Sequence, residues 1–81
     1  MSESKSTLKR LKNPMPPFVR DALNERALMD AYLARPPYQQ NDYLGWIERA
    51  RRPETKEKRL NQMLNELEKG DVYMRMKWQP K

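Results

Sequence analysis

The fold is decided by one stretch of the sequence, residues 43–60, which reads YLGWIERARRPETKEKRL. Four of its apolar residues recur at the i, i+3, i+4, i+7 spacing of one helix face: Tyr43, Trp46, Ile47 and Ala50. Pro53 then interrupts the pattern. A proline suits the first turn of a new helix, because a backbone N–H at that position would have no hydrogen-bond acceptor within the helix. The stretch therefore predicts two helices joined by a short turn, with Trp46 at the centre of the core.

Proline positions and apolar spacing predict the helices on either side of this stretch. We expect a short first helix from Pro17, a second helix that has Asn24 as its N-cap and ends at Arg35, and a third helix from Pro37 or Tyr38. The fourth helix has a clear apolar face and should end at Gly70; that face consists of Leu60, Met63, Leu64 and Leu67. The predicted class is all-α, a small bundle of a short first helix plus three longer helices, with disordered basic termini.

The two ends of the chain differ in composition from the helical region. Residues 1–15 are polar and charged, and they offer too little apolar surface to offset the entropy lost on ordering, so we expect a disordered basic N-terminal segment. Residues 16–70 should form the helical domain. Residues 71–81 alternate apolar and polar side chains, but no partner strand is evident in the chain, so we expect a flexible basic tail.

Positive charge is concentrated at the ends of the 81-residue chain, whose net charge is +6. Residues 1–20 contain five basic residues against one acid, a net charge of +4, and residues 72–81 contain three basic residues and no acid, a net charge of +3. The region between them has nine basic and ten acidic residues, a net charge of −1. A basic end can contact nucleic acid or another anionic surface, or it can serve only to keep the chain soluble.

Several function classes are excluded by residues that the sequence lacks. With no cysteine and no histidine, the chain cannot form a disulfide, a Cys/His metal site, or a thiol or imidazole catalyst. Its two glycines are too few for a phosphate-binding loop, and no acid is flanked by an apolar run that would raise its pKa. We therefore expect no enzymatic activity and no cofactor. No apolar run approaches the roughly 20 residues of a membrane span, and we expect a cytoplasmic location.

The first candidate interaction surface is a basic corner around Pro53. It contains six cations and three interleaved acids, a net charge of +3. A helix that follows a break could present cations and amides to DNA, as in a helix-turn-helix, but alternating charge is more typical of a solvated, ion-paired surface. The residues that we single out are Arg49, Arg52, Glu54, Thr55, Lys56 and Arg59.

The second candidate is the C-terminal tail. Most aromatic residues fall in the apolar stripes, where core packing is favoured over stacking on bases. The tail residues fall outside those stripes, and methionine and tryptophan adapt well to grooves on a partner. The possible tail contacts are Tyr73, Met74, Met76 and Trp78, and a disordered end is the alternative interpretation.

The opening stretch resembles the C-terminal helical module of the YdeI/OmpD-associated family. The similarity rests on Tyr43, Trp46, Ile47, Ala50, Glu54, Thr55 and Arg59, and it extends over roughly residues 16–70. Gly45 stands where a larger or polar residue is usual in the family, and Arg51 and Lys56 exchange the usual lysine and arginine. The resemblance implies a helical fold and a broadly defined role in bacteriocin protection or stress tolerance, and it implies no catalytic residues.

Two functions are compatible with these observations. The first is a non-enzymatic helical interaction module whose partner is another protein. The alternative is a small basic nucleic-acid-binding protein that uses the corner from Arg49 to Arg59 and the basic tails. The two differ in salt dependence, because binding to phosphates through lysine and arginine weakens steeply as salt is raised.

Overall fold

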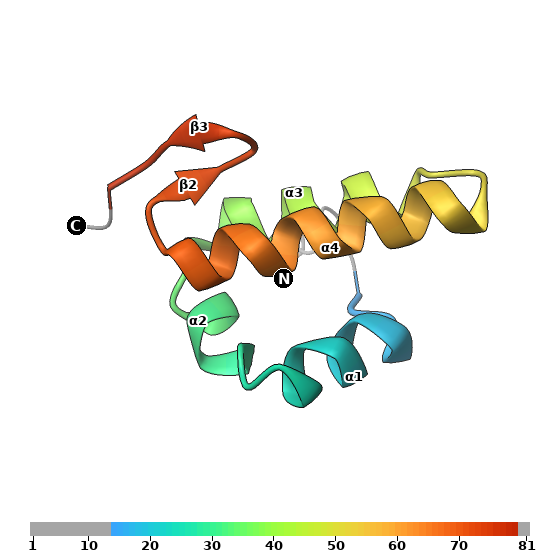
Figure 1. The fold of residues 1–81 in the computed structure, drawn as a ribbon, viewed down its shortest axis with the longest axis horizontal. Coiled ribbons are helices and arrows are strands. Elements are labelled where there is room, and N and C mark those ends of the chain that lie inside the picture. Colours follow the sequence, from blue (N-terminus) through green and yellow to red (C-terminus); the bar gives the residue numbers. More distant parts are fainter. Residues whose placement is uncertain (1–13, 80–81) are drawn as a thin grey trace, which may run out of the picture.

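The computed structural model describes residues 14–79, which form four helices followed by a two-stranded hairpin (Figure 1). The elements are α1 (Pro17–Glu25), α2 (Met29–Leu33), α3 (Pro37–Glu48), α4 (Pro53–Lys69), β2 (Val72–Tyr73) and β3 (Met76–Lys77). The prediction of a mostly helical chain is confirmed for this part. The prediction of disorder over residues 1–15 falls almost entirely outside the described residues.

Helices α3 and α4 form the long pair of the molecule and pack against each other. In Figure 1, α4 crosses the view with α3 behind it, α1 and α2 lie below the pair, and the hairpin lies above the end of α4. Helix α2 also contacts α4, and β2 packs on α4. Helix α4 is thus contacted by α3, by α2 and by the hairpin, while one long face of it is left outside.

Prolines begin three of the helices, as predicted. Pro17, Pro37 and Pro53 each occupy the first helical turn of α1, α3 and α4. Helix α4 ends at Gly70, whose φ of 83° is left-handed and whose N–H donates to the carbonyl of Glu66 at 2.9 Å. This backbone conformation costs glycine nothing, which explains why the helix stops there.

The second helix was predicted wrongly. Helix α1 runs through Asn24, and α2 begins only at Met29 and has five residues, so it is shorter than α1 instead of longer. The reason is a Schellman motif at the end of α1: Ala27 has a φ of 56°, its N–H donates to the carbonyl of Asn24, and the N–H of Leu28 donates to the carbonyl of Leu23 at 2.8 Å. The motif usually has glycine at the left-handed position, and alanine gives no such signal.

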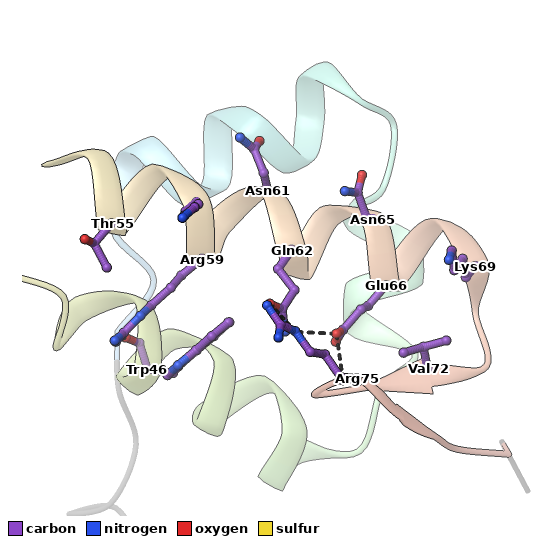
Figure 2. A pocket seen from close by; sticks show the side chains of 11 residues that line it. Trp46, Thr55, Arg59, Asn61, Gln62, Asn65, Glu66, Lys69, Val72 and Arg75 are labelled. Carbon is purple, nitrogen blue, oxygen red and sulfur yellow. Dashed lines mark hydrogen bonds between the residues drawn. The ribbon is translucent and has the colours of Figure 1, made fainter.

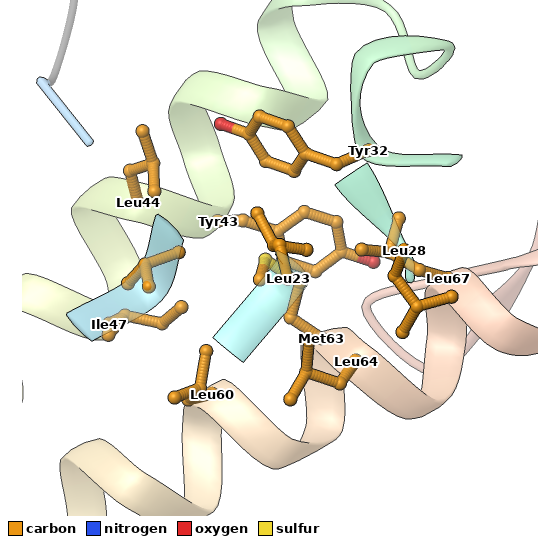
Figure 3. Packing of buried hydrophobic residues seen from close by; sticks show 11 residues of the cluster. Leu23, Leu28, Tyr32, Tyr43, Leu44, Ile47, Leu60, Met63, Leu64 and Leu67 are labelled. Atoms are coloured by element: carbon orange, nitrogen blue, oxygen red, sulfur yellow. The ribbon is translucent and has the colours of Figure 1, made fainter. Parts of the chain in front are cut away.

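One apolar core joins the four helices (Figure 3). Its buried residues are Val19, Leu23, Leu28, Tyr32, Tyr43, Leu44, Ile47, Leu60, Met63, Leu64 and Leu67. Trp46 is not at the centre, which corrects the prediction: it is partly buried and packs against the cluster, whereas Tyr43 and Ile47 are fully buried. Trp46 precedes Ile47 by one residue and so lies about 100° around the helix, at the rim between α3 and α4.

Residues 72–77 of the tail form a hairpin, so the prediction that its alternating residues have no partner strand is wrong. Strands β2 and β3 are antiparallel, with Val72 opposite Lys77 and Tyr73 opposite Met76. The two residues between the strands both have positive φ, 50° at Met74 and 67° at Arg75, as a type I′ turn requires. That turn strongly favours Asn-Gly, so Met-Arg gives no hairpin signal in the sequence.

Candidate functional site

The hairpin is attached to the helices through the carboxylate of Glu66, which α4 directs inward. This carboxylate accepts hydrogen bonds from the hydroxyl of Tyr43 (2.5 Å), the side-chain amide of Gln62 (3.0 Å), and the backbone N–H groups of Met74 (2.8 Å) and Arg75 (2.9 Å). Glu66 is 5% exposed. Its two bonds to the turn offset the roughly 1–2 kcal/mol that each non-glycine residue loses in the left-handed region.

The guanidinium of Arg35 makes a second attachment. It donates to the side-chain oxygen of Gln39 (2.9 Å) and to the backbone carbonyls of Glu66 (3.1 Å) and Val72 (2.8 Å). It also lies 4.6 Å from the centre of the Trp78 ring. Arg35 is 4% exposed, so its charge is satisfied by carbonyl dipoles, including one at the negative end of α4.

Three tyrosines complete this polar cluster. Tyr73 donates to Asp42 at 2.8 Å, and its ring meets the rings of Tyr38 and Tyr43 edge-on, with centroids 6.0 and 5.3 Å apart. Burial raises the pKa of Tyr43 well above its ordinary value, and the hydrogen bond to Glu66 raises it further. Burial and then Asp42 raise the pKa of Tyr73 in the same way. These phenols therefore act as hydrogen-bond donors near neutral pH.

Most of the predicted tail contacts are used inside the molecule. Tyr73 and Trp78 contact Asp42 and Arg35, and Met74 packs against the core while its N–H bonds Glu66. Met76 is 60% exposed. Binding of a partner by these four residues stays a prediction, and the structure offers only Met76 as a largely exposed apolar contact.

An open groove of about 790 Å³ runs along the outer face of α4, between Trp46 of α3 and the hairpin (Figure 2). We call it the α4 groove. Four cations and three amide side chains line it: Lys58, Arg59, Lys69 and Arg75, with Asn61, Gln62 and Asn65. Glu66 is the one acid in its lining, and its oxygens are bonded to Tyr43, Gln62 and the turn. The groove is therefore electropositive.

The cations of the α4 groove are not equivalent. Arg59 donates to the carbonyl of Trp46 at 2.6 Å and lies 5.2 Å from the centre of its ring, so it is already engaged. Arg75 donates to the side-chain oxygen of Gln62 at 3.2 Å. Within residues 14–79, none of these four cations forms an ion pair, and Lys58 and Lys69 form no side-chain hydrogen bond either. An incoming ligand could therefore meet these two lysines without breaking an existing hydrogen bond.

The six predicted surface residues are not brought together. Thr55 and Arg59 line the α4 groove, whereas Lys56 is 3.9 Å from Glu48 and faces the ring of Phe18 at 5.9 Å. Of the remaining three, Arg49 and Arg52 lie between α3 and α4 and Glu54 lies in the first turn of α4: Arg49 is exposed, and Arg52 pairs with Glu54 at 3.8 Å. The basic corner is thus divided between different faces.

Sequence reasoning missed part of the groove. Asn65 and Lys69 were not singled out, although they continue a polar stripe along one face of α4 with Lys58, Asn61 and Gln62. The five residues recur at i, i+3, i+4, i+7 and i+11, so the stripe could have been found by the same periodicity as the core. The contribution of Arg75 could not have been found this way, because it depends on the hairpin.

The described part of the chain contains no cluster of three or more His, Cys, Asp or Glu residues that could hold a metal ion. None of its helices is both long and apolar enough to cross a membrane. A family model described as "Bacteriocin-protection, YdeI or OmpD-Associated" matches residues 13–70, which is more than half of the chain. The comparisons with curated proteins and with solved structures gave no match.

Proposed function

Because the chain belongs to the bacteriocin-protection, YdeI- or OmpD-associated family, we propose that it is a non-enzymatic interaction module that acts by binding another protein. The match confirms the family resemblance found around Trp46 and Pro53. A role in bacteriocin protection or stress tolerance, and a cytoplasmic location, belong to the same proposal.

The observation that carries the proposal is the α4 groove. In this proposal the helices act as a small bundle that holds the outer face of α4 open to a partner. The face is long, since the 17 residues of α4 span about 25 Å. Among residues 14–79, it offers two cations with neither an ion pair nor a hydrogen bond, Lys58 and Lys69, and three amides that can both donate and accept hydrogen bonds. Such a surface suits a polar partner segment.

The buried polar groups already form hydrogen bonds with one another, which supports a non-enzymatic role. The oxygens of Glu66 are occupied by donors from its own chain. The phenols of Tyr43 and Tyr73 donate to the carboxylates of Glu66 and Asp42. These groups are therefore committed to holding the hairpin.

The alternative of nucleic-acid binding is less well supported by the arrangement of the corner. A DNA reader built from the predicted corner would need those corner residues on one exposed face of the helix after the break. Lys56 instead lies beside Glu48 and Phe18, while Arg59 is held on Trp46. A titration with mixed DNA and RNA at two salt concentrations tests this alternative, and no binding at the lower salt would remove it.

Site-specific photo-crosslinking in the native host tests the proposal. A benzoyl-phenylalanine at Asn61 in the α4 groove should give a discrete adduct with one protein. The matched control is the same group at Asn24, which is also an exposed helical asparagine but lies on α1. The proposal fails if Asn61 gives no adduct or if both positions give the same set of adducts.

A further inference from the structure

We infer that the α4 groove binds an extended acidic peptide segment of its partner. The inference rests on the proposed function and names the chemistry of the partner. It follows from the position of Lys58 and Lys69, which have no hydrogen-bond or ion-pair partner among residues 14–79, from the groups between them and from the walls of the groove.

The two lysines set the spacing of the charges. Lys58 and Lys69 are 11 residues apart, which is close to three helical turns, so they project from the same face about 16 Å apart along the axis. An extended peptide advances about 3.3 Å per residue. The partner segment should therefore have two carboxylates about five residues apart.

The side chains of the polar stripe between the two lysines are amides and suit a peptide backbone. Asn61, Gln62 and Asn65 form the middle of the stripe. Side-chain amides offer both donors and acceptors, as a peptide group does, so an extended segment can bond to them between its two charged ends. Figure 2 shows Asn61 and Asn65 projecting from α4, with Gln62 turned toward Arg75.

The walls of the groove add one apolar contact. Trp46 and Val72 are partly buried and line the groove on the α3 side and the hairpin side. Because Arg59 lies over the ring of Trp46, Val72 is the one that offers a surface for a single apolar side chain of the partner. The segment that fits has an acid at each end and an apolar residue between them.

The same geometry favours a peptide over single-stranded nucleic acid. Proteins that track a nucleic-acid backbone use a continuous line of cations and open aromatic faces on which bases stack. Here neutral amides separate the two lysines along the stripe, and Arg75 is bonded to one of them, Gln62. The guanidinium of Arg59 lies 5.2 Å from the centre of the Trp46 ring, over a face that a base would need. The groove therefore matches two discrete carboxylates.

A titration followed by NMR tests the inference. The probe is a capped six-residue peptide with aspartate at positions 1 and 6, leucine at position 3 and alanine elsewhere. It should shift the side-chain amide signals of Asn61 and Asn65. The same peptide with both aspartates replaced by asparagine should bind at least tenfold more weakly, and a six-nucleotide thymidine strand should leave these signals in place.

Two double variants remove equal charge from different faces. Lys58→Ala with Lys69→Ala should weaken binding of the aspartate peptide at least tenfold, while Arg49→Ala with Arg52→Ala should leave it within about twofold. Equal losses in the two variants, no binding of the peptide, or shifts caused by the thymidine strand instead would each overturn the inference. If the Asn61 crosslink survives such a result, only the acidic character of the partner is wrong; if the crosslink is absent too, the proposed function fails.

Discussion

Two regions at opposite ends of α4 each contain an arginine and a glutamate, which are exposed in one region and buried in the other. At the turn before α4, Arg52 and Glu54 lie 3.8 Å apart with side chains that are 78% and 72% exposed. At the other end, Arg35 and Glu66 are 4% and 5% exposed and together hold the hairpin. The first region is dense in charge and the second contains only a few charged groups.

The difference shows that charge density in a sequence does not identify the polar groups on which a fold depends. An exposed ion pair contributes about 0–1 kcal/mol, because water solvates the separated charges almost as well. A buried group that loses its partner costs about 1–3 kcal/mol, because no water replaces the lost hydrogen bond. Substitution of the buried Arg35 or Glu66 should therefore lower the free energy of unfolding far more than substitution of a residue in the basic corner.

The largest expected effect comes from Glu66→Ala. It would leave the hydroxyl of Tyr43 and the N–H groups of Met74 and Arg75 without their acceptor, so we expect a loss of about 3–5 kcal/mol in the free energy of unfolding. Glu54→Ala should change this free energy by less than about 0.5 kcal/mol. Urea unfolding followed by circular dichroism measures both.

An unfolded Glu66→Ala variant would itself agree with this expectation, since the whole domain should be stable by only about 3–8 kcal/mol. Tyr43→Phe provides the graded case: it removes one bond to Glu66 and should cost about 1–2 kcal/mol. Equal costs for Glu66→Ala and Glu54→Ala would contradict the distinction between the two regions.

An intermediate effect is expected from alkaline pH. Burial raises the pKa of Tyr32 to about 12 and that of Tyr43 higher still, whereas the unfolded phenols titrate near 10.0. Below pH 10 both states keep their phenolic protons. Above it the unfolded chain releases protons that the folded chain retains, so the free energy of unfolding should fall as pH rises.

Tyr43→Phe serves as the control for this prediction, because it removes one of the raised phenols and leaves every lysine and arginine in place. Its free energy of unfolding should decline less steeply between pH 10 and 11.5 than that of the unmodified protein. Parallel declines would show that Tyr43 does not contribute to the alkaline loss.

The smallest expected effect is a gain in stability from Arg75→Gly. Glycine adopts the φ of 67° without strain. The relief of this strain should outweigh two losses, the greater entropy of glycine in the unfolded chain and the hydrogen bond from Arg75 to Gln62. We expect a net gain of about 0.5–1 kcal/mol. Arg52→Gly, at a position with a φ of −98°, should instead lose a few tenths of a kcal/mol, and thermal melting compares the two. A loss of stability in Arg75→Gly would show that the turn is not strained.

The sequence was sufficient for the parts of the fold that depend on local signals. Pro17, Pro37 and Pro53 correctly predicted where three helices begin, and Gly70 where α4 ends. The turns without a glycine were missed. Ala27 and the Met74–Arg75 turn adopt left-handed conformations that their residue types do not favour, and the second is held by Glu66 from eight residues away.

The candidate site was predictable to a similar degree. Arg59 and Thr55 were predicted as surface residues and both line the α4 groove. Lys69 was missed, although the polar stripe along α4 contained the signal. Trp46 was placed in the core because its spacing fits the apolar face, and only the packing of α3 on α4 shows that it lies at the rim of the groove.

The hairpin is attached to the helices through the buried carboxylate of Glu66. This attachment holds one wall of the α4 groove in place, and it is what makes the buried end of α4 differ from the exposed one. Native-state hydrogen exchange at the backbone amides of Met74 and Arg75 measures it directly. Both amides should be protected to within about tenfold of the amide of Met63 in the middle of α4, because each donates to a buried carboxylate. Exchange at the rate of an unfolded chain would contradict this attachment and remove the hairpin wall of the groove.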